Sequence, residues 1–325
     1  ADFTYMSRAL QLAQKGLYTT DPNPRVGCVI VKDDEVVGEG WHVRSGEPHA
    51  EIHALQEAGN KAAGATAYVT LEPCCHHGKT PPCSEALLNA KVSRVVVAMQ
   101  DPHSRVAGQG LQQLRDAGIE VEVGVLEAQA RALNPGFIKR MQTGRPYVRN
   151  KLAMSLDGRT AMASGESKWI TSDAARQDVQ RLRARSSAIV TGVGTVLADD
   201  PSMTVRLEGT ERQPLRVVLD THLSMPTNAQ MLQQAGRTMV MTCSDDEAAR
   251  EALEHAGAEV NCLPFCSNTV DMQAVLDALG EMEVNEVLLE TGATLSGAML
   301  KAGLTDELVI YMAPVLMGDN ARGLF

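Results

Sequence analysis

The chain has few aromatic residues and no basic tract. Phe, Tyr and Trp together make up 3% of the 325 residues, and the formal net charge is -10 at pH 7. An acidic surface repels a polyanion at long range, and nucleic-acid bases would find few rings on which to stack. The composition therefore argues against nucleic acid as a substrate or partner.

Long apolar runs and a disulfide framework are also missing. No stretch approaches the roughly 18 apolar residues that cross a bilayer, and the N-terminal residues lack the basic region and apolar core of a signal peptide. Seven cysteines is an odd number, and Cys28, Cys243, Cys262 and Cys266 show no spacing typical of disulfides. We expect a soluble protein of the reducing cytoplasm that makes no membrane contact.

Length and composition predict two domains. The apolar content of 44% lets 325 residues bury a sizeable core, and about 150 residues is a usual domain size. Thr143-Gly144-Arg145-Pro146 has the composition of a linker. The expected domains span residues 1–144 and 145–325.

Apolar residues in the first domain alternate between helical and strand spacing. We expect helices over residues 3–16, 49–59, 111–117 and 127–141, and a further helix that begins near Pro82. We expect strands over 26–31 and 36–41, joined as a hairpin, and over 67–71, 95–98 and 121–125. This alternation of helices and short strands indicates a layered α/β domain.

The second domain reads as another α/β sheet. Apolar strands are expected over residues 147–152, 188–191, 216–219, 238–242, 286–289 and 308–313, with helices between most of them.

The most informative motif combines one histidine, one glutamate and two cysteines. His49-Ala50-Glu51 is followed by Pro73-Cys74 and, after an eight-residue interval, by Cys83. A histidine and two cysteines can hold zinc and leave its fourth position open, while the glutamate stays free to move protons. His-x-Glu with a later Pro-Cys-x-x-Cys is the signature of zinc-dependent base deaminases, although the second spacing is longer here.

A closed, structural zinc site is the alternative. Cys75 or His76 would then be the fourth ligand, but adjacent residues rarely reach one ion from a strand end, and such a site would leave Glu51 without a role. In the open site, zinc lowers the pKa of a bound water to about 7 for attack on an amidine carbon. Glu51 would carry the proton to a ring nitrogen and then to departing ammonia.

Several polar residues near this motif are candidates for substrate binding. Asn23, between two prolines, has an amide that suits the edge of a heterocycle, and an ordinary turn residue is the alternative. His42, His76 and Lys79 are candidates for a phosphate or ribose, with solvated loop residues as the alternative.

Two glycine-containing turns follow strands of the second domain. Gly192-Val193-Gly194-Thr195 resembles the start of a dinucleotide fingerprint, but Leu197 replaces its third glycine. Thr291–Gly297 could cradle a phosphate with backbone amides before a helix begins, and the absence of lysine excludes a Walker loop. Each is a plain tight turn in the alternative reading, and together they favour a nucleotide cofactor. Asp220 after a strand would indicate NAD if the fold were a Rossmann unit.

Longer strings identify a family resemblance over nearly the whole chain. The chain closely resembles the bifunctional deaminase/reductases of bacterial riboflavin biosynthesis. The strings in the first half are Pro22-Asn23-Pro24, Val26-Gly27-Cys28, Gly46-Glu47-Pro48-His49-Ala50-Glu51, Leu71-Glu72-Pro73-Cys74, His76-His77-Gly78 and Thr80-Pro81-Pro82-Cys83. Those in the second half are Ser155-Leu156-Asp157-Gly158-Arg159, Trp169-Ile170-Thr171 and Leu197-Ala198-Asp199-Asp200-Pro201.

The resemblance implies a cytidine-deaminase-like α/β/α domain followed by a dihydrofolate-reductase-like α/β domain. The first would use zinc to remove the 2-amino group of a diaminopyrimidinone ribosylamine 5′-phosphate. The second would use NADPH to reduce the opened ribose to a ribityl chain. We also expect a homo-oligomer.

The resemblance also implies roles for individual residues. His49, Cys74 and Cys83 would bind zinc, Glu51 would carry protons, and Asn23, His42, His76 and Lys79 would hold the pyrimidine substrate. The residues expected to contact NADPH are Ala153, Trp169, Thr195, Asp199 and the loop Gly292, Ala293, Thr294, Leu295, Ser296, Gly297 and Ala298. Those expected on the sugar-phosphate side are Lys151, Ser167, Arg183, Met203, Arg206 and Glu290. For the charged residues among them, a solvated face is the alternative.

The chain departs from the family pattern in two places. Cys75 stands where the family has a serine, so a second thiol could compete for metal or oxidise. The family continues for some tens of residues beyond Phe325, so we expect the last reductase strands to lie beyond this sequence.

Two other functions remain open from the residues alone. One is a nucleic-acid base deaminase with an accessory domain, and the acidic charge counts against it. The other is a zinc-stabilised nucleotide-binding regulator, in which Glu51 would have no catalytic role.

Overall fold

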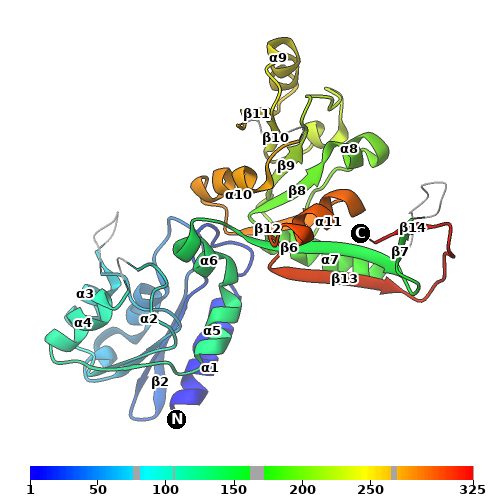
Figure 1. Ribbon diagram of the computed structural model, residues 1–325. Helices are drawn as coiled ribbons and strands as arrows, with labels where there is room; N and C mark the ends of the chain where they lie inside the picture. Colours follow the sequence, from blue (N-terminus) through cyan, green and yellow to red (C-terminus); the bar gives the residue numbers. More distant parts are fainter. Residues whose placement is uncertain (76–80, 105–106, 162–171, 265–268, 325) are drawn as a thin grey trace. The chain divides into compact units, whose positions relative to one another are not determined.

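The protein forms two compact units, each with its own sheet. The computed structural model describes residues 1–325 except 76–80, 105–106, 162–171, 265–268 and 325 (Figure 1). The first unit is Ala1–Thr143 and the second is Gly144–Phe325. None of the helices in the described ranges combines the length and the apolar character that a membrane span requires.

The first unit is built on a five-stranded sheet in the order β2-β1-β3-β4-β5. Its strands are β1 (Gly27–Lys32), β2 (Glu35–Trp41), β3 (Thr66–Val69), β4 (Arg94–Val97) and β5 (Glu120–Val123). β1 is antiparallel to both β2 and β3, whereas β3, β4 and β5 are parallel. Asp33 and Asp34 both have positive φ, 50° and 62°, which is the backbone of a tight hairpin turn.

Helices cover both faces of this sheet. They are α1 (Asp2–Gln14), α2 (Ala50–Ala58), α3 (Cys83–Asn89), α4 (Gln109–Asp116), α5 (Glu127–Leu133) and α6 (Pro135–Thr143), with a short 3₁₀ turn η1 (Gly59–Ala62). Buried residues of α2, α3 and α4 form one apolar core with the sheet. Those of α1, α5 and α6 form a second core on the other face. The unit is therefore an α/β/α sandwich.

The single helix predicted over residues 127–141 is wrong, because the structure has two helices there. Pro135 has no backbone N–H and starts α6 instead of continuing α5. The buried side chain of Asn134 accepts a hydrogen bond from the Arg25 N–H at 2.8 Å and donates one to the Arg25 carbonyl at 2.9 Å. This contact with Arg25, just before β1, fixes the position of the break between α5 and α6.

Close packing of α2 against β2 sets the position of the first candidate site. A Cβ atom on Gly40 would lie 2.3 Å from the carbonyl oxygen of Ala50, so only glycine fits there. The start of α2, with His49 just before it and Glu51 in its first turn, is thereby held against the sheet.

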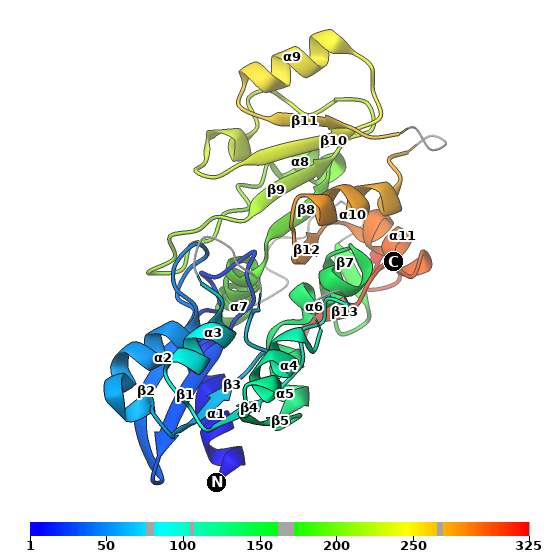
Figure 2. The same ribbon diagram turned by 90° about the vertical axis from the view of Figure 1, so that its left-hand side faces the viewer.

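The second unit is built on a seven-stranded sheet in the order β11-β10-β9-β8-β12-β6-β13. All neighbouring strands that pair within its described residues are parallel, and Figure 2 shows β8 to β11 side by side. The strands are β6 (Tyr147–Ser155), β8 (Ala188–Gly192), β9 (Leu215–Leu219), β10 (Thr238–Thr242), β11 (Glu259–Cys262), β12 (Glu286–Glu290) and β13 (Glu307–Ala313). A separate two-stranded ladder joins β7 (Arg159–Ala161) to β14 (Arg322–Gly323).

Helices also flank this sheet. They are α7 (Asp173–Arg185), α8 (Val193–Asp199), α9 (Glu247–His255), α10 (Met272–Glu281) and α11 (Ala293–Lys301), with a 3₁₀ turn η2 (Gln230–Gln233). α10 and α11 bury apolar residues against one face, and α8 and α9 against the other. The predicted α/β fold class is thus confirmed for both halves of the chain.

Candidate active sites

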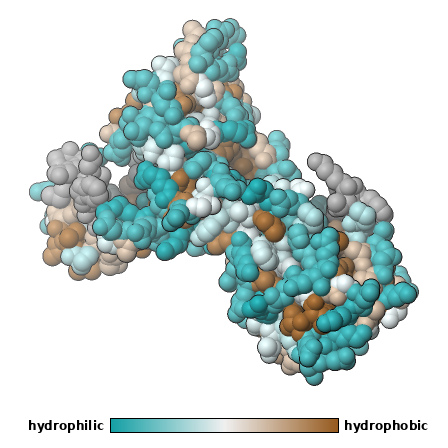
Figure 3. All heavy atoms as spheres, turned by 180° about the vertical axis from the view of Figure 1, so that it is seen from behind, coloured by the Kyte–Doolittle hydropathy of each residue, from teal (hydrophilic) through white to brown (hydrophobic). Residues whose placement is uncertain are grey.

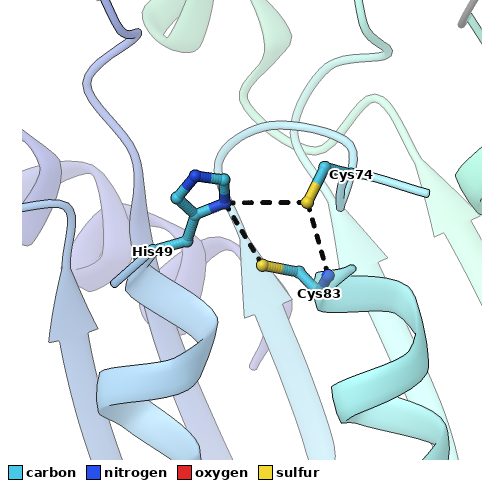
Figure 4. Close-up of side chains that lie close together, drawn as sticks. All are labelled: His49, Cys74 and Cys83. Carbon is cyan, nitrogen blue, oxygen red and sulfur yellow. Dashed lines mark hydrogen bonds between the residues drawn. The ribbon is translucent and has the colours of Figure 1, made fainter. Parts of the chain in front are cut away.

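His49, Cys74 and Cys83 converge at one place in the first unit (Figure 4). His49 immediately precedes α2, Cys74 follows β3, and Cys83 is the first residue of α3. His49 Nδ1 lies 3.6 Å from Cys74 Sγ and 3.3 Å from Cys83 Sγ. A tetrahedral zinc ion with bonds of about 2.0–2.1 Å to nitrogen and about 2.3 Å to sulfur separates these atoms by about 3.5 Å. The donor set therefore fits zinc.

The start of α3 holds Cys74 in this arrangement. The Cys83 N–H donates to Cys74 Sγ at 3.3 Å, and the Ser84 N–H donates to the Cys74 carbonyl at 3.1 Å. Ser84 was missed by the sequence analysis, because its role depends on contacts between distant segments of the chain. Its hydroxyl lies 3.1 Å from the same carbonyl and 2.7 Å from Gln113 Oε1.

Hydrogen bonds within the cluster shift its protonation. The pKa of Cys74 is lowered because its sulfur accepts hydrogen bonds from Cys83 and His49. The pKa of Cys83 is raised by the neighbouring Cys74 sulfur and by burial, and the pKa of His49 is raised by its bond to Cys74. Because zinc binds thiolates and neutral imidazole, metal uptake displaces these protons.

Glu51 lies beside the cluster in the first turn of α2. Its side chain is buried, with 3% of the residue exposed. Burial raises the pKa of this carboxyl group. A carboxylate in such a setting accepts a proton more readily than an exposed one.

Asn23 and His42 form a second contact next to the metal cluster. His42 Nδ1 lies 3.2 Å from the Pro48 carbonyl, and His42 Nε2 lies 3.1 Å from Asn23 Nδ2. The His42 ring packs edge-on against His49, with 5.3 Å between ring centroids. The structure therefore brings two predicted substrate residues to the zinc cluster.

The other residues singled out from the sequence of the first unit are His76, Lys79 and Cys75. His76 and Lys79 lie outside the described residues. Cys75 is half-buried, and its thiol contacts Gln109 Oε1 at 3.9 Å. Among the described residues, the metal-binding group contains only His49, Cys74 and Cys83, so Cys75 does not complete it.

Three charged residues meet in the second unit. Lys151 on β6 lies opposite Glu290 on the neighbouring strand β12, with 3.9 Å between Nζ and Oε2. Arg183 of α7 makes a bidentate contact with Glu290, at 2.6 and 2.9 Å. Burial raises the pKa of Glu290, but Arg183 and Lys151 outweigh it and lower the pKa overall. The cluster of Lys151, Arg183 and Glu290 is therefore charged, with one net positive charge.

The chain after α8 lies near this cluster. Arg183 Nη1 donates to the Thr204 carbonyl at 3.1 Å, between the predicted residues Met203 and Arg206. Met203 is buried and has a positive φ of 49°, an uncommon backbone state for this residue. Arg206 is exposed, and its Nη1 lies 3.4 Å from Ser202 Oγ. Ser167 and Trp169 lie outside the described residues.

Two helices begin at the carboxyl edge of neighbouring strands. Gly192 precedes α8 and Gly292 precedes α11, and in the described part of the chain neither start has a side-chain cap. A Cβ atom on Gly194 or Gly292 would meet none of the described atoms within 4 Å. Uncapped backbone N–H groups beside open space are suited to bind a phosphate.

The predicted loop over Gly292–Ala298 is wrong, because α11 already begins at Ala293. Leu295 packs against the core, and the buried Ser296 hydroxyl donates to Asn150 Oδ1 at 3.1 Å. Gly292, Ala293 and Thr294 are at the helix start, whereas Gly297 and Ala298 lie in its second turn. Ala153 on β6 and Thr195 on α8 are half-buried, and Asp199 is exposed at the end of α8.

Asp220 has a local structural role. Its carboxylate accepts hydrogen bonds from Ser224 Oγ at 3.0 Å and from the Met225 N–H at 2.7 Å, and the residue is 1% exposed. The strand order also differs from that of a Rossmann unit. The argument for NAD from Asp220 therefore fails.

Family models match both units. Residues 1–99 match the cytidine and deoxycytidylate deaminase zinc-binding region, and residues 146–325 match the RibD C-terminal domain. The riboflavin biosynthesis protein RibD of Escherichia coli (strain K12) is 53% identical, over 99% of this chain and 90% of that protein. The Haemophilus influenzae protein of the same name is 50% identical, over 99% of this chain and 88% of its own length.

Solved structures agree with this match. Acinetobacter baumannii RibD superposes with a TM-score of 0.93 at 51% identity, and the match covers all of this chain and 90% of that one. A Thermotoga maritima diaminohydroxyphosphoribosylaminopyrimidine deaminase/5-amino-6-(5-phosphoribosylamino)uracil reductase gives 0.89 at 36% identity, covering all of this chain and 89% of the other.

Proposed function

Because the chain belongs to the RibD family of riboflavin biosynthesis proteins, we propose that its two units act in sequence on one pyrimidine phosphate. The chain is a bifunctional deaminase and reductase. We assign the zinc-dependent deaminase to residues 1–144 and the NADPH-dependent reductase to residues 145–325. The convergence of His49, Cys74 and Cys83 beside Glu51 carries the proposal.

The first unit hydrolyses the 2-amino group of 2,5-diamino-6-ribosylamino-4(3H)-pyrimidinone 5′-phosphate and releases ammonia. His49, Cys74 and Cys83 hold zinc, which when bound supplies Lewis-acid activation of water. Glu51 takes one proton from water and passes it to the ring nitrogen. It then takes the second proton, from the hydroxyl now attached to C2, and passes it to the amino group, which leaves as ammonia. The burial of Glu51 keeps bulk water from competing for these protons.

Asn23 and His42 orient the pyrimidine. The Pro48 carbonyl can only accept a hydrogen bond, so His42 carries its proton on Nδ1, and Nε2 accepts from the Asn23 amide. Burial lowers the pKa of His42, which favours this neutral ring. Asn23 Oδ1 then faces the substrate as an acceptor. His76 and Lys79 complete the proposed substrate site.

The second unit reduces the opened ribose of the deaminated product to a ribityl chain. NADPH supplies the hydride, and the starts of α8 and α11 bind its phosphates with backbone N–H groups. The open space over Gly194 and Gly292 supports this placement. Ala153, Trp169, Thr195 and Asp199 are the further proposed contacts.

The positive cluster of the second unit binds the sugar phosphate. Lys151 and Arg183 share the single carboxylate of Glu290, so positive charge remains for a phosphate or a sugar hydroxyl. Arg206 adds another cation, and Met203 and Ser167 are proposed to line the same side. Hydride transfer then requires mainly the orientation of two bound reactants.

We also propose a homo-oligomer in the cytoplasm. Leu308, Ile310 and Met312 alternate along the edge strand β13 and are 41%, 37% and 55% exposed. Most of the face in Figure 3 is hydrophilic, and exposed apolar side chains such as these favour burial against another surface, for which we propose a second copy of the chain. The described cysteines are free thiols, which a reducing compartment preserves.

An ordered assay tests the function. Ammonia release from the pyrimidine phosphate should proceed without NADPH, and NADPH oxidation should begin only after ammonia has been released. Single-stranded DNA with cytosine or adenine should release no ammonia. Turnover of the DNA alone, or NADPH oxidation without prior deamination, would contradict the proposal.

A further inference from the structure

Glu72 carries the densest set of hydrogen bonds to backbone near the metal cluster, and nothing in the proposed chemistry uses it. The residue is 5% exposed. Oε2 accepts from the N–H groups of Asp101 at 3.0 Å and Gly108 at 2.9 Å. Oε1 accepts from the N–H groups of Gly110 at 2.9 Å and Leu111 at 3.4 Å. One side chain thus satisfies four backbone donors.

These four donors belong to the start of α4 and the chain before it. Gly108 is the N-cap residue of α4 and, within the described residues, offers no side-chain cap. Glu72 therefore supplies the cap from a different segment of the chain. A carboxylate at a helix start is stabilised both by the unpaired N–H groups and by the helix dipole.

The capped helix packs directly on the segment that carries Cys74. A Cβ atom on Gly110 would lie 2.3 Å from the Pro73 carbonyl oxygen, so the first turn of α4 touches the residue before Cys74. One turn later, Gln113 Oε1 accepts from the Ser84 hydroxyl, which also lies 3.1 Å from the Cys74 carbonyl. α4 therefore contacts the residue before Cys74 directly and is linked to the Cys74 carbonyl through Ser84.

We propose that Glu72 is a positioning residue for the zinc site. It fixes α4 against Pro73 and so holds Cys74 Sγ at the distance from His49 and Cys83 that a tetrahedral ion requires. The inference rests on the proposed zinc-dependent deaminase. It assigns to Glu72 no contact with the substrate and no proton transfer.

Glu72→Gln tests this role. The substitution keeps the size of the side chain but turns an NH₂ group toward two backbone donors, so two of the four hydrogen bonds are lost. We expect the zinc dissociation constant, measured by competition with a chromophoric chelator, to rise about 10- to 100-fold. Ammonia release should fall at limiting zinc and recover when zinc is added in excess, with KM for the pyrimidine unchanged.

Thr70→Val is the matched control. Thr70 is buried and lies two residues before Glu72 in the sequence. Its Oγ1 accepts a hydrogen bond at 3.1 Å from the N–H of Gly27 on β1, so this contact does not involve α4. Its loss should lower thermal stability and leave the zinc dissociation constant within about twofold of the original chain. If Glu72→Gln does not fold, Glu72→Asp keeps the charge with a shorter reach and should raise the constant by a smaller factor.

The outcomes separate this inference from the function on which it rests. If both variants lose stability equally and the folded Glu72 variant binds zinc as tightly as the original chain, Glu72 is only structural and the inference is wrong. If the original chain itself binds no zinc, the proposed deaminase fails first. A rise in KM that excess zinc does not reverse would also overturn the positioning role.

Discussion

Asn23 Nδ2 donates a hydrogen bond to His42 Nε2 over 3.1 Å, and this bond fixes the orientation of the Asn23 amide group. Its direction follows from the Pro48 carbonyl on the other side of the His42 ring, which can only accept. In the proposed site, the histidine would therefore act on the substrate through the asparagine, by orienting an acceptor oxygen toward the pyrimidine.

Asn23→Ala should weaken deamination and leave reduction intact. Losing one substrate hydrogen bond costs about 1–1.5 kcal/mol, so kcat/KM for ammonia release should fall about tenfold. Reduction of the already deaminated substrate by the same preparation is the control. An unchanged kcat/KM for ammonia release would show that this amide does not hold the substrate.

Glu290→Gln should impair the reductase unit in both stability and activity. The change leaves Arg183 and Lys151 without their shared carboxylate, and breaking a largely buried ion pair costs about 3 kcal/mol in the free energy of unfolding. Reduction should be lost while ammonia release remains. Glu259→Gln, which breaks an exposed pair with Arg237, should cost less than about 1 kcal/mol. Equal effects of the two substitutions would contradict a special role for Glu290.

Gly292→Val should reduce NADPH affinity without unfolding the protein. The new side chain enters space in which a Cβ meets none of the described atoms within 4 Å, so the fold should tolerate it. A clash with a bound phosphate costs about 1–3 kcal/mol, which raises KM for NADPH about 5- to 150-fold. The measurement is initial rate against NADPH concentration, with thermal unfolding as the control. An unchanged KM for NADPH would show that the cofactor does not bind at the start of α11.

Asp2 should make stability depend on pH in the acid range. Its hydrogen bonds with Arg94, at 3.0 Å, and with Tyr68, at 2.7 Å, lower the pKa of this carboxyl group from 3.8 to about 2. The contribution is therefore fully present above pH 3.8 and is lost as the pH falls toward about 2. The difference in unfolding temperature between the original chain and Asp2→Asn should shrink between pH 5 and pH 2.5. A constant difference would show that the carboxylate charge is not involved.

Local sequence signals predicted most of the elements. The β1–β2 hairpin and the buried strands β8, β9, β10 and β12 have dense apolar runs, and their edges agree with the prediction within a residue or two. β11 was missed because this edge strand, Glu259–Cys262, is only partly buried and has no apolar run. The break between α5 and α6 depends on a contact of Asn134 with Arg25, 109 residues away, which periodicity does not register.

In the candidate sites too, local chemistry could be predicted from the sequence, whereas contacts between distant residues could not. His49, Cys74 and Cys83 could be grouped in advance because ligand chemistry limits which residues can share a zinc ion. The cap that Glu72 places on α4 joins residues up to 39 positions apart, and the bond from Arg183 to Glu290 spans 107. Neither follows from spacing, since each depends on how strands and helices pack. The helical start of α11 within the predicted loop was hidden by Gly292 and Gly297, which suggested a turn.

Zinc content measured together with ammonia release, in the original chain and in Glu51→Gln, tests the central claim most directly. The account predicts one zinc per chain in both proteins, because Glu51 is not a ligand. Ammonia release should fall by a factor of about 10² to 10⁴ in the variant, because a positioned proton carrier is lost. A chain without zinc, or a variant that keeps both its zinc and its rate of ammonia release, would contradict the account.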